Sequence, residues 1–103
     1  MTSLIRIILL AGLTTPAVAQ DPEALVNGAD CRGCHQVEQA MLGPSYQAVA
    51  QRYRGEDSAE DTIFKRMREG SKGIWGEAPM PPVTEDTLTD KELRAVIDWI
   101  LSR

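Results

Sequence analysis

The segment at residues 31–35, with the sequence CRGCH, limits what this chain can fold into more than any other feature. Two cysteines separated by two residues and followed by a histidine have the spacing at which a c-type haem is attached covalently. On one turn of helix, Cys31 and Cys34 would place both sulfurs on one side of the backbone, where each can form a thioether with a haem vinyl group. His35 would then bind the iron through an imidazole nitrogen.

The residue census strengthens this prediction. The 103 residues include two cysteines and one histidine, and all three lie in the motif. A thiol redox site of the thioredoxin kind shares the Cys-x-x-Cys spacing but is expected in a βαβ setting, which this sequence does not show. A disulfide stays an alternative, whereas a zinc site would need a second pair of ligands. We therefore predict one covalently attached haem c per chain.

Residues 1–19 have the pattern of a secretory signal peptide. Arg6 supplies the positive charge, residues 7–13 form a short apolar core, and Ala17 and Ala19 mark a small-residue cleavage site before Gln20. The apolar run is too short to cross a bilayer, although an uncleaved membrane anchor is the alternative. The expected division is a signal peptide at 1–19 and an exported, periplasmic haem domain at 20–103.

The charge balance excludes some classes of partner. The chain has 11 Lys and Arg against 15 Asp and Glu, and loss of Arg6 with the signal peptide would change the net charge from −4 to −5. An acidic chain has no electrostatic attraction to nucleic acid or to anionic lipid. We expect no nucleic-acid partner, no stable membrane insertion after cleavage, and a monomer.

Four segments begin with residues typical of helix N-caps and continue with apolar residues at helical spacing. The expected N-caps are Asp21, Ser45, Ser58 and Thr89, which predict helices that begin at residues 22, 46, 59 and 90. Ser58 and Thr89 are each followed three residues later by an acidic residue, the pattern of a capping box. The first helix is expected to run directly into the CRGCH motif, and the last is expected to pack across the first. No strand is predicted.

Residues 70–83 contain three glycines and three prolines, which exclude a regular helix or a central strand. Met80 lies among the prolines, and its thioether sulfur is a soft ligand suited to haem iron on the face opposite His35. Methionine is often only a core filler, but Met67 lies on an apolar helix face and Met41 follows His35 too closely to reach the far side of the ring. Met80 is therefore the predicted second axial ligand, on a backbone stiffened by proline.

Three further residues are candidates for contacts around the cofactor. The carbonyl of Pro44 can accept the second ring N–H of His35, although Gly43 and Pro44 are also typical of a turn before a helix. Arg66 lies at the edge of an apolar helix face, where it can reach a haem propionate or remain a solvated flank. Trp75 can donate its indole N–H to a propionate or serve as an apolar contact.

With these residues placed, the chain resembles class I c-type cytochromes, most closely the short, soluble, single-haem bacterial subgroup. The resemblance covers nearly all of residues 20–103. It implies an all-α fold of four or five helices around one covalently bound haem, with crossing N- and C-terminal helices. The segments that carry it are CRGCH at 31–35, LGP at 42–44, GIWG at 73–76, PMPP at 79–82 and DWILS at 98–102.

The same resemblance implies a role for each candidate residue. Cys31 and Cys34 would carry the haem, and His35 and Met80 would be the axial ligands of the iron. Pro44 would accept the hydrogen bond from His35. Arg66 and Trp75 match positions that bind a haem propionate.

The resemblance implies a periplasmic one-electron carrier and not an enzyme. Its expected partners are redox proteins of the nitrite reductase, terminal oxidase or quinol–cytochrome c reductase type. Docking would use apolar residues around an exposed haem edge. We suggest Met41 and Leu42 as the patch, although both can also be ordinary surface or core residues. Two other classes stay open. One is a haem enzyme or gas sensor in which Met80 is displaced, and the other is a haem-free thiol–disulfide protein.

Overall fold

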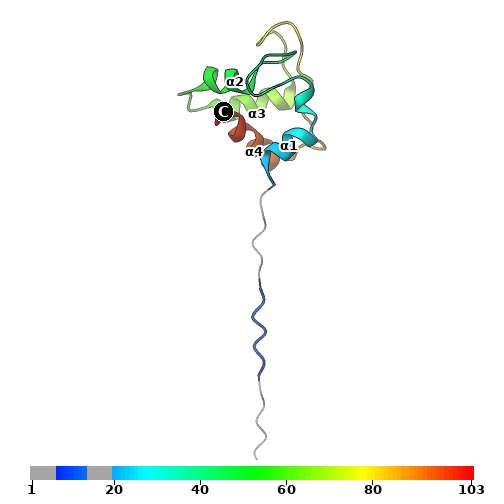
Figure 1. Ribbon diagram of the computed structural model, residues 1–103, viewed down its shortest axis with the longest axis vertical. Helices are drawn as coiled ribbons and strands as arrows, with labels where there is room; N and C mark the ends of the chain where they lie inside the picture. The colour runs from blue at the N-terminus through cyan, green and yellow to red at the C-terminus, as the bar shows by residue number, and fades with distance from the viewer. Residues whose placement is uncertain (1–6, 14–19) are drawn as a thin grey trace, which may run out of the picture.

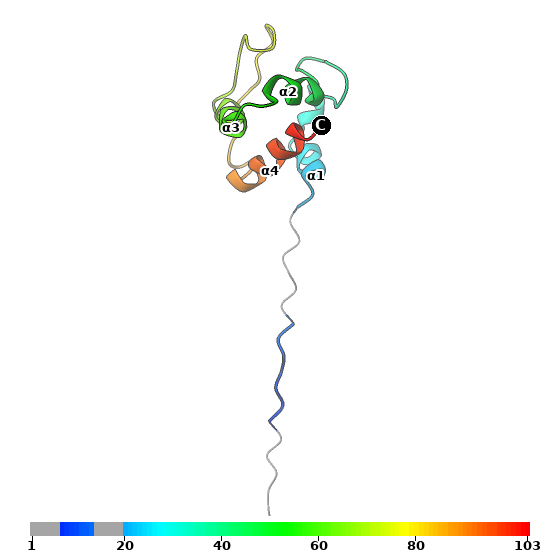
Figure 2. The ribbon, with the colours of Figure 1, turned by 90° about the vertical axis from the view of Figure 1, so that its left-hand side faces the viewer.

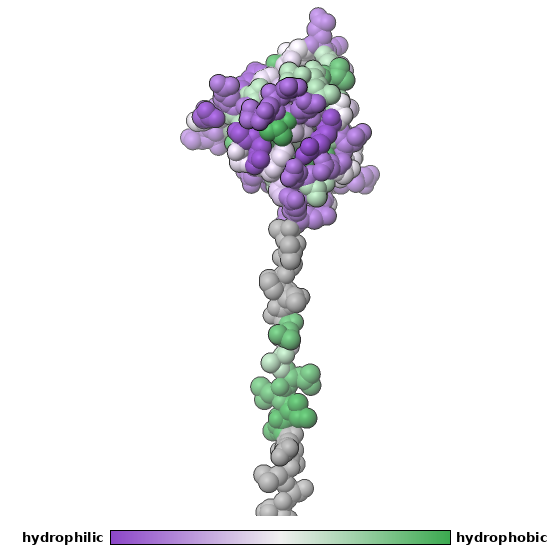
Figure 3. Space-filling model, viewed as in Figure 1, coloured by the Kyte–Doolittle hydropathy of each residue, from purple (hydrophilic) through white to green (hydrophobic). Residues whose placement is uncertain are grey.

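The computed structural model describes residues 7–13 and 20–103. The predicted signal peptide falls largely on residues 1–6 and 14–19, which lie outside the described part. Residues 7–13 are exposed and not helical, and they form an apolar stretch apart from the mainly polar surface of the helical part (Figure 3). Within the described ranges, no helix is long and apolar enough to span a membrane. The division into 1–19 and 20–103 therefore stays a prediction.

The described residues form four α-helices and one 3-10 turn, which confirms the predicted all-α class. The only strand-like pairing in these residues is an isolated bridge between Ser71 and Met80. In chain order the elements are α1 (Pro22–Gly28), η1 (Cys31–Gly33), α2 (Tyr46–Tyr53), α3 (Ala59–Glu69) and α4 (Asp90–Leu101) (Figure 1).

Helix α4 is the centre of the core, because it packs against α1, α2 and α3 (Figure 2). Its residues Leu93 and Ile97 are fully buried, as is Val26 of α1. Burial of each such side chain stabilises the fold by about 1.5–3 kcal/mol. The predicted packing of the last helix against the first is therefore confirmed.

Three of the four predicted N-caps form as expected. The side chains of Asp21, Ser45 and Thr89 each accept a hydrogen bond from a backbone N–H in the first turn of the following helix. Thr89 completes a capping box, because the Glu92 carboxylate also accepts the Thr89 N–H at 3.0 Å. The capping box predicted at Ser58 is wrong. Ser58 has φ −94° and ψ 11° instead of an extended conformation, and its side chain makes no capping hydrogen bond.

The predicted continuation of the first helix into the CRGCH motif is also wrong. Helix α1 ends at Gly28, and Asp30 adopts a left-handed conformation with φ 60°. Aspartate is one of the few residues other than glycine that adopts this conformation at modest cost. The reversal at Asp30 ends one helical axis and starts another, so Cys31 begins a separate 3-10 turn.

This difference between caps gives a matched pair of variants. Thr89→Ala is expected to lower the free energy of unfolding by about 1 kcal/mol, because the first turn of α4 loses a capping partner. Ser58→Ala is expected to change it by less than about 0.5 kcal/mol. Denaturant unfolding of both haem-loaded variants measures the difference. Equal losses would contradict the assignment of the caps.

Candidate functional site

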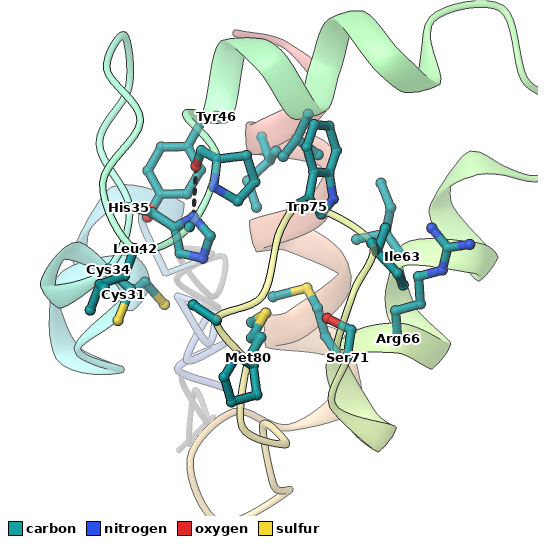
Figure 4. Close-up of a pocket in the computed structure, with 18 of the residues that line it drawn as sticks. Cys31, Cys34, His35, Leu42, Tyr46, Ile63, Arg66, Ser71, Trp75 and Met80 are labelled. Carbon is teal, nitrogen blue, oxygen red and sulfur yellow. Dashed lines mark hydrogen bonds between the residues drawn. The ribbon is translucent and has the colours of Figure 1, made fainter.

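The helices and the loops between them enclose a cavity of about 370 Å³ (Figure 4). Its walls come from the CRGCH motif, α2, α3, the 70–83 loop and α4, and they are mostly apolar. The charged side chains among the lining residues are Arg66 and Lys72, and both are basic. The cavity therefore suits a large, mostly apolar group that carries some negative charge.

Cys31 and Cys34 line this cavity from one turn. The backbone N–H groups of Cys34 and His35 both donate to the Cys31 carbonyl, at 3.2 and 3.0 Å. No disulfide joins the two sulfurs, and Figure 4 shows them on one side of the cavity. Burial raises the pKa of the Cys31 thiol, whereas redox-active cysteines have a lowered pKa. This environment does not favour the thiol–disulfide alternative.

His35 is held in one orientation by its surroundings. Its Nδ1 lies 2.7 Å from the Pro44 carbonyl oxygen. Because a carbonyl can only accept, Nδ1 donates this hydrogen bond, and in the neutral ring Nε2 therefore keeps its lone pair. The ring also stacks on Tyr46, with centroids 5.5 Å apart and an angle of 26° between planes. The free nitrogen faces the cavity on the side where Met80 lies (Figure 4).

Gly43 allows the backbone to approach this imidazole closely. A Cβ at position 43 would overlap the His35 ring, 2.7 Å from Nδ1 and 2.9 Å from Nε2. Gly43→Ala is therefore expected to displace His35 and to lower the free energy of unfolding by about 2 kcal/mol. Gly28→Ala is the control, because a Cβ there meets nothing within 4 Å. Unfolding curves and the haem absorption spectrum measure both effects, and a neutral Gly43→Ala variant would contradict this packing.

Met80 lines the cavity from the 70–83 loop, and its backbone is fixed at both polar groups. The Met80 N–H donates to the Ser71 carbonyl at 2.8 Å, and its carbonyl accepts from the Ser71 N–H at 3.1 Å. Gly70 precedes this pair with φ 78°, and a Cβ there would lie 2.9 Å from the Met80 carbonyl oxygen. The position of Met80 thus depends on this pairing and on Gly70 as well as on the neighbouring prolines.

Arg66 and Trp75 also line the cavity, away from the two cysteines (Figure 4). Arg66 donates to the hydroxyl of Tyr53, a contact that the sequence did not predict. Trp75 keeps 39% of its surface exposed. The lining of the cavity therefore includes two hydrogen-bond donors, the guanidinium of Arg66 and the indole of Trp75.

The sequence places Tyr46 and Tyr53 on an apolar helix face but does not predict that both line the cavity. The Tyr46 hydroxyl is buried without a hydrogen-bond partner among the described residues. Burial raises the pKa of Tyr46 to about 12, so this hydroxyl stays neutral. Its ring makes an edge contact with Trp99 of α4 at 5.2 Å. Tyr46 therefore contacts both the His35 ring and the Trp99 ring of α4.

The residues around the cavity fit a haem c group. Two thiols, an imidazole nitrogen and a thioether are the donors that this cofactor uses, and the basic Arg66 and Lys72 suit its carboxylates. In the described ranges, no cluster of three His, Cys, Asp or Glu residues offers a site for another metal. The fold and the site together define a small c-type haem protein.

Comparison with known proteins gives the family. The chain matches the cytochrome c family over residues 19–103. It is 40% identical over 87 residues to cytochrome c-551 of Stutzerimonas stutzeri, covering 84% of this chain and 81% of that protein. It is 44% identical over 80 residues to cytochrome c2 of Rubrivivax gelatinosus, covering 78% and 94%. The crystal structure of wild-type cytochrome c552 of Nitrosomonas europaea superimposes with a TM-score of 0.71 at 35% identity, covering 78% of this chain and 96% of that one.

The chain therefore belongs to the cytochrome c family. It is a small class I c-type cytochrome with one covalently attached haem c. It is an electron-transfer protein and not an enzyme.

Proposed function

We propose that this cytochrome is a periplasmic one-electron carrier in which Cys31 and Cys34 hold the haem and His35 and Met80 bind its iron. The observation that carries the proposal is that these four side chains, from two distant segments, line one cavity. When bound, haem c supplies an iron that gains or loses one electron. If His35 and Met80 both hold the iron, the protein would leave no position on it for a substrate.

The surrounding residues set the properties of this site. The Pro44 carbonyl fixes the orientation of the His35 ring and holds the proton on Nδ1, which leaves Nε2 for the iron. The thioether of Met80 and the apolar lining favour the reduced state and a raised potential. We assign Arg66 and Trp75 to the propionates, because their N–H groups are donors in the lining of the cavity.

We further propose that residues 1–19 direct export and that the partners are respiratory redox proteins. The support for export is the pattern of a charged residue, an apolar core and a small-residue cleavage site. The proposed partners are of the nitrite reductase, terminal oxidase or quinol–cytochrome c reductase type. This part of the proposal rests on the likeness to a subgroup of cytochromes.

Export of the full chain in a bacterium that matures c-type cytochromes tests the proposal. We expect a coloured periplasmic protein whose redox titration shows a single one-electron step. The reduced protein is expected not to bind carbon monoxide, because His35 and Met80 would both hold the iron and leave it no open position. Carbon monoxide binding would instead support a gas sensor or a haem enzyme, and colour confined to the cytoplasm would contradict export.

The suggested docking patch consists of Met41 and Leu42. Leu42 is 69% exposed and Met41 is 48% exposed, and Leu42 also lines the cavity. Leu42→Glu is expected to slow electron transfer to the partner about tenfold, because the charge would have to be desolvated on docking. The reduction potential of the variant is measured as well, so that weaker docking is distinguished from a changed driving force. Gln51→Glu adds the same charge at an exposed position outside the cavity lining, and an equal slowing in this control would contradict the patch.

A further inference from the structure

The 70–83 loop is fastened to the protein at its base. The Ser71 and Met80 backbones pair with each other, and the Val83 N–H donates to the Met67 carbonyl at 2.7 Å. Between Ser71 and Met80, residues 72–79 form a tip that is exposed at every position except Ile74. The tip also contains Gly73 and Gly76, both with positive φ. Exposure and the two glycines leave the backbone conformation of residues 72–79 weakly fixed by the tip itself.

One side chain outside the loop connects this tip to the helices. Arg52, in the last turn of α2, donates from Nη1 to the Ile74 carbonyl at 3.0 Å. Its Cζ also lies 4.5 Å from the centroid of the Trp75 ring. Across the part of the chain that the structure describes, the bond to Ile74 is the only hydrogen bond between residues 72–79 and the rest of the protein.

The two contacts of Arg52 require a guanidinium. The planar group can stack on an indole and direct an N–H at a carbonyl at the same time, whereas an ammonium is a compact, strongly hydrated charge. The next residue, Tyr53, lines the cavity from the same turn of α2. Arg52 therefore joins the loop tip to a helix that forms the cavity wall.

We propose that Arg52 is a positioning residue that holds the loop tip over the cavity and fixes the Trp75 ring there. With the tip held, the Met80 side of the haem is closed to ligands from solvent. This inference rests on the proposed function, because it takes Met80 as the iron ligand. It adds a residue that is not among those lining the cavity.

Imidazole binding to the oxidised haem-loaded protein measures how often this side opens. Imidazole must displace Met80, so its apparent affinity rises with the fraction of molecules in which the loop has moved. Arg52→Gln is expected to bind imidazole about tenfold more tightly than the wild type, because it loses both a hydrogen bond and a cation–π contact. Arg52→Lys should lie between the two, since it keeps the charge without the planar group.

Arg54→Gln is the matched control. Arg54 is also exposed and lies two residues further along, and its replacement removes the same charge near α2. It is expected to bind imidazole as the wild type does. An equal gain in affinity in Arg52→Gln and Arg54→Gln, or no gain in either, would overturn the proposal.

Hydrogen exchange of the two indole N–H groups separates positioning from a general loss of stability. In Arg52→Gln, the Trp75 N–H is expected to exchange faster, while the Trp99 N–H in α4 keeps its wild-type rate. Acceleration of both by the same factor would mean global loosening and would overturn the proposal. If instead the proposed function is wrong and Met80 does not bind the iron, Met80→Ala will bind imidazole no better than the wild type. This result is distinct from the outcomes for Arg52.

Discussion

Replacement of both Cys31 and Cys34 by serine is expected to yield a colourless chain without stable helical structure. The haem would no longer be attached, and the cavity of about 370 Å³ would lose its contents. Its mostly apolar walls would then face water, and each large apolar side chain that lost its burial would cost about 1.5–3 kcal/mol. A few such losses are comparable to the whole stability of a typical domain, about 5–15 kcal/mol.

Far-UV circular dichroism and haem absorbance of the exported double variant measure this effect. The single variant Cys34→Ser is the control, because one thioether can still form, and it should retain part of the coloured, folded protein. A haem-free double variant with the helix content of the wild type would contradict the view that the cofactor completes the core.

Met80→Ala has the second largest expected effect. Loss of the thioether is expected to lower the reduction potential by on the order of a few hundred mV, since axial ligands set haem potentials over a range of about 0.8 V. The reduced variant should also bind carbon monoxide. Met67→Leu is the control, because Met67 lines the same cavity but is assigned to the core, and leucine preserves its volume. A large fall in potential in Met67→Leu, with Met80→Ala unchanged, would contradict the ligand assignment.

The first residue of a helix could be predicted where a capping side chain within two or three residues determines it. Asp21, Ser45 and Thr89 cap their helices through side-chain hydrogen bonds to N–H groups two or three residues away. The prediction at Ser58 failed because a cap also needs an extended backbone, which the sequence does not specify. The predicted continuous helix into the CRGCH motif failed for the same reason, since the left-handed turn at Asp30 has no marker as clear as a glycine.

The candidate site could be predicted in part. The CRGCH motif and the proline-flanked Met80 can be recognised in the sequence by residue type and spacing. The close approach of Gly43 to His35 and the contacts of Arg52 with the loop tip were not predicted. They join residues 8 and 22 positions apart, counted from His35 to Gly43 and from Arg52 to Ile74, and only the folded chain brings them together.

The central claim is that the Met80 side chain lies against the iron of a haem whose other face is bound by His35. The proton NMR spectrum of the reduced protein tests this most directly, because the ring current of a haem shifts protons at its centre far upfield. We expect one methionine methyl signal in that region, and we expect it to vanish in Met80→Ala. A spectrum in which every methionine methyl lies in the ordinary range, or an upfield methyl that persists in Met80→Ala, would contradict the claim.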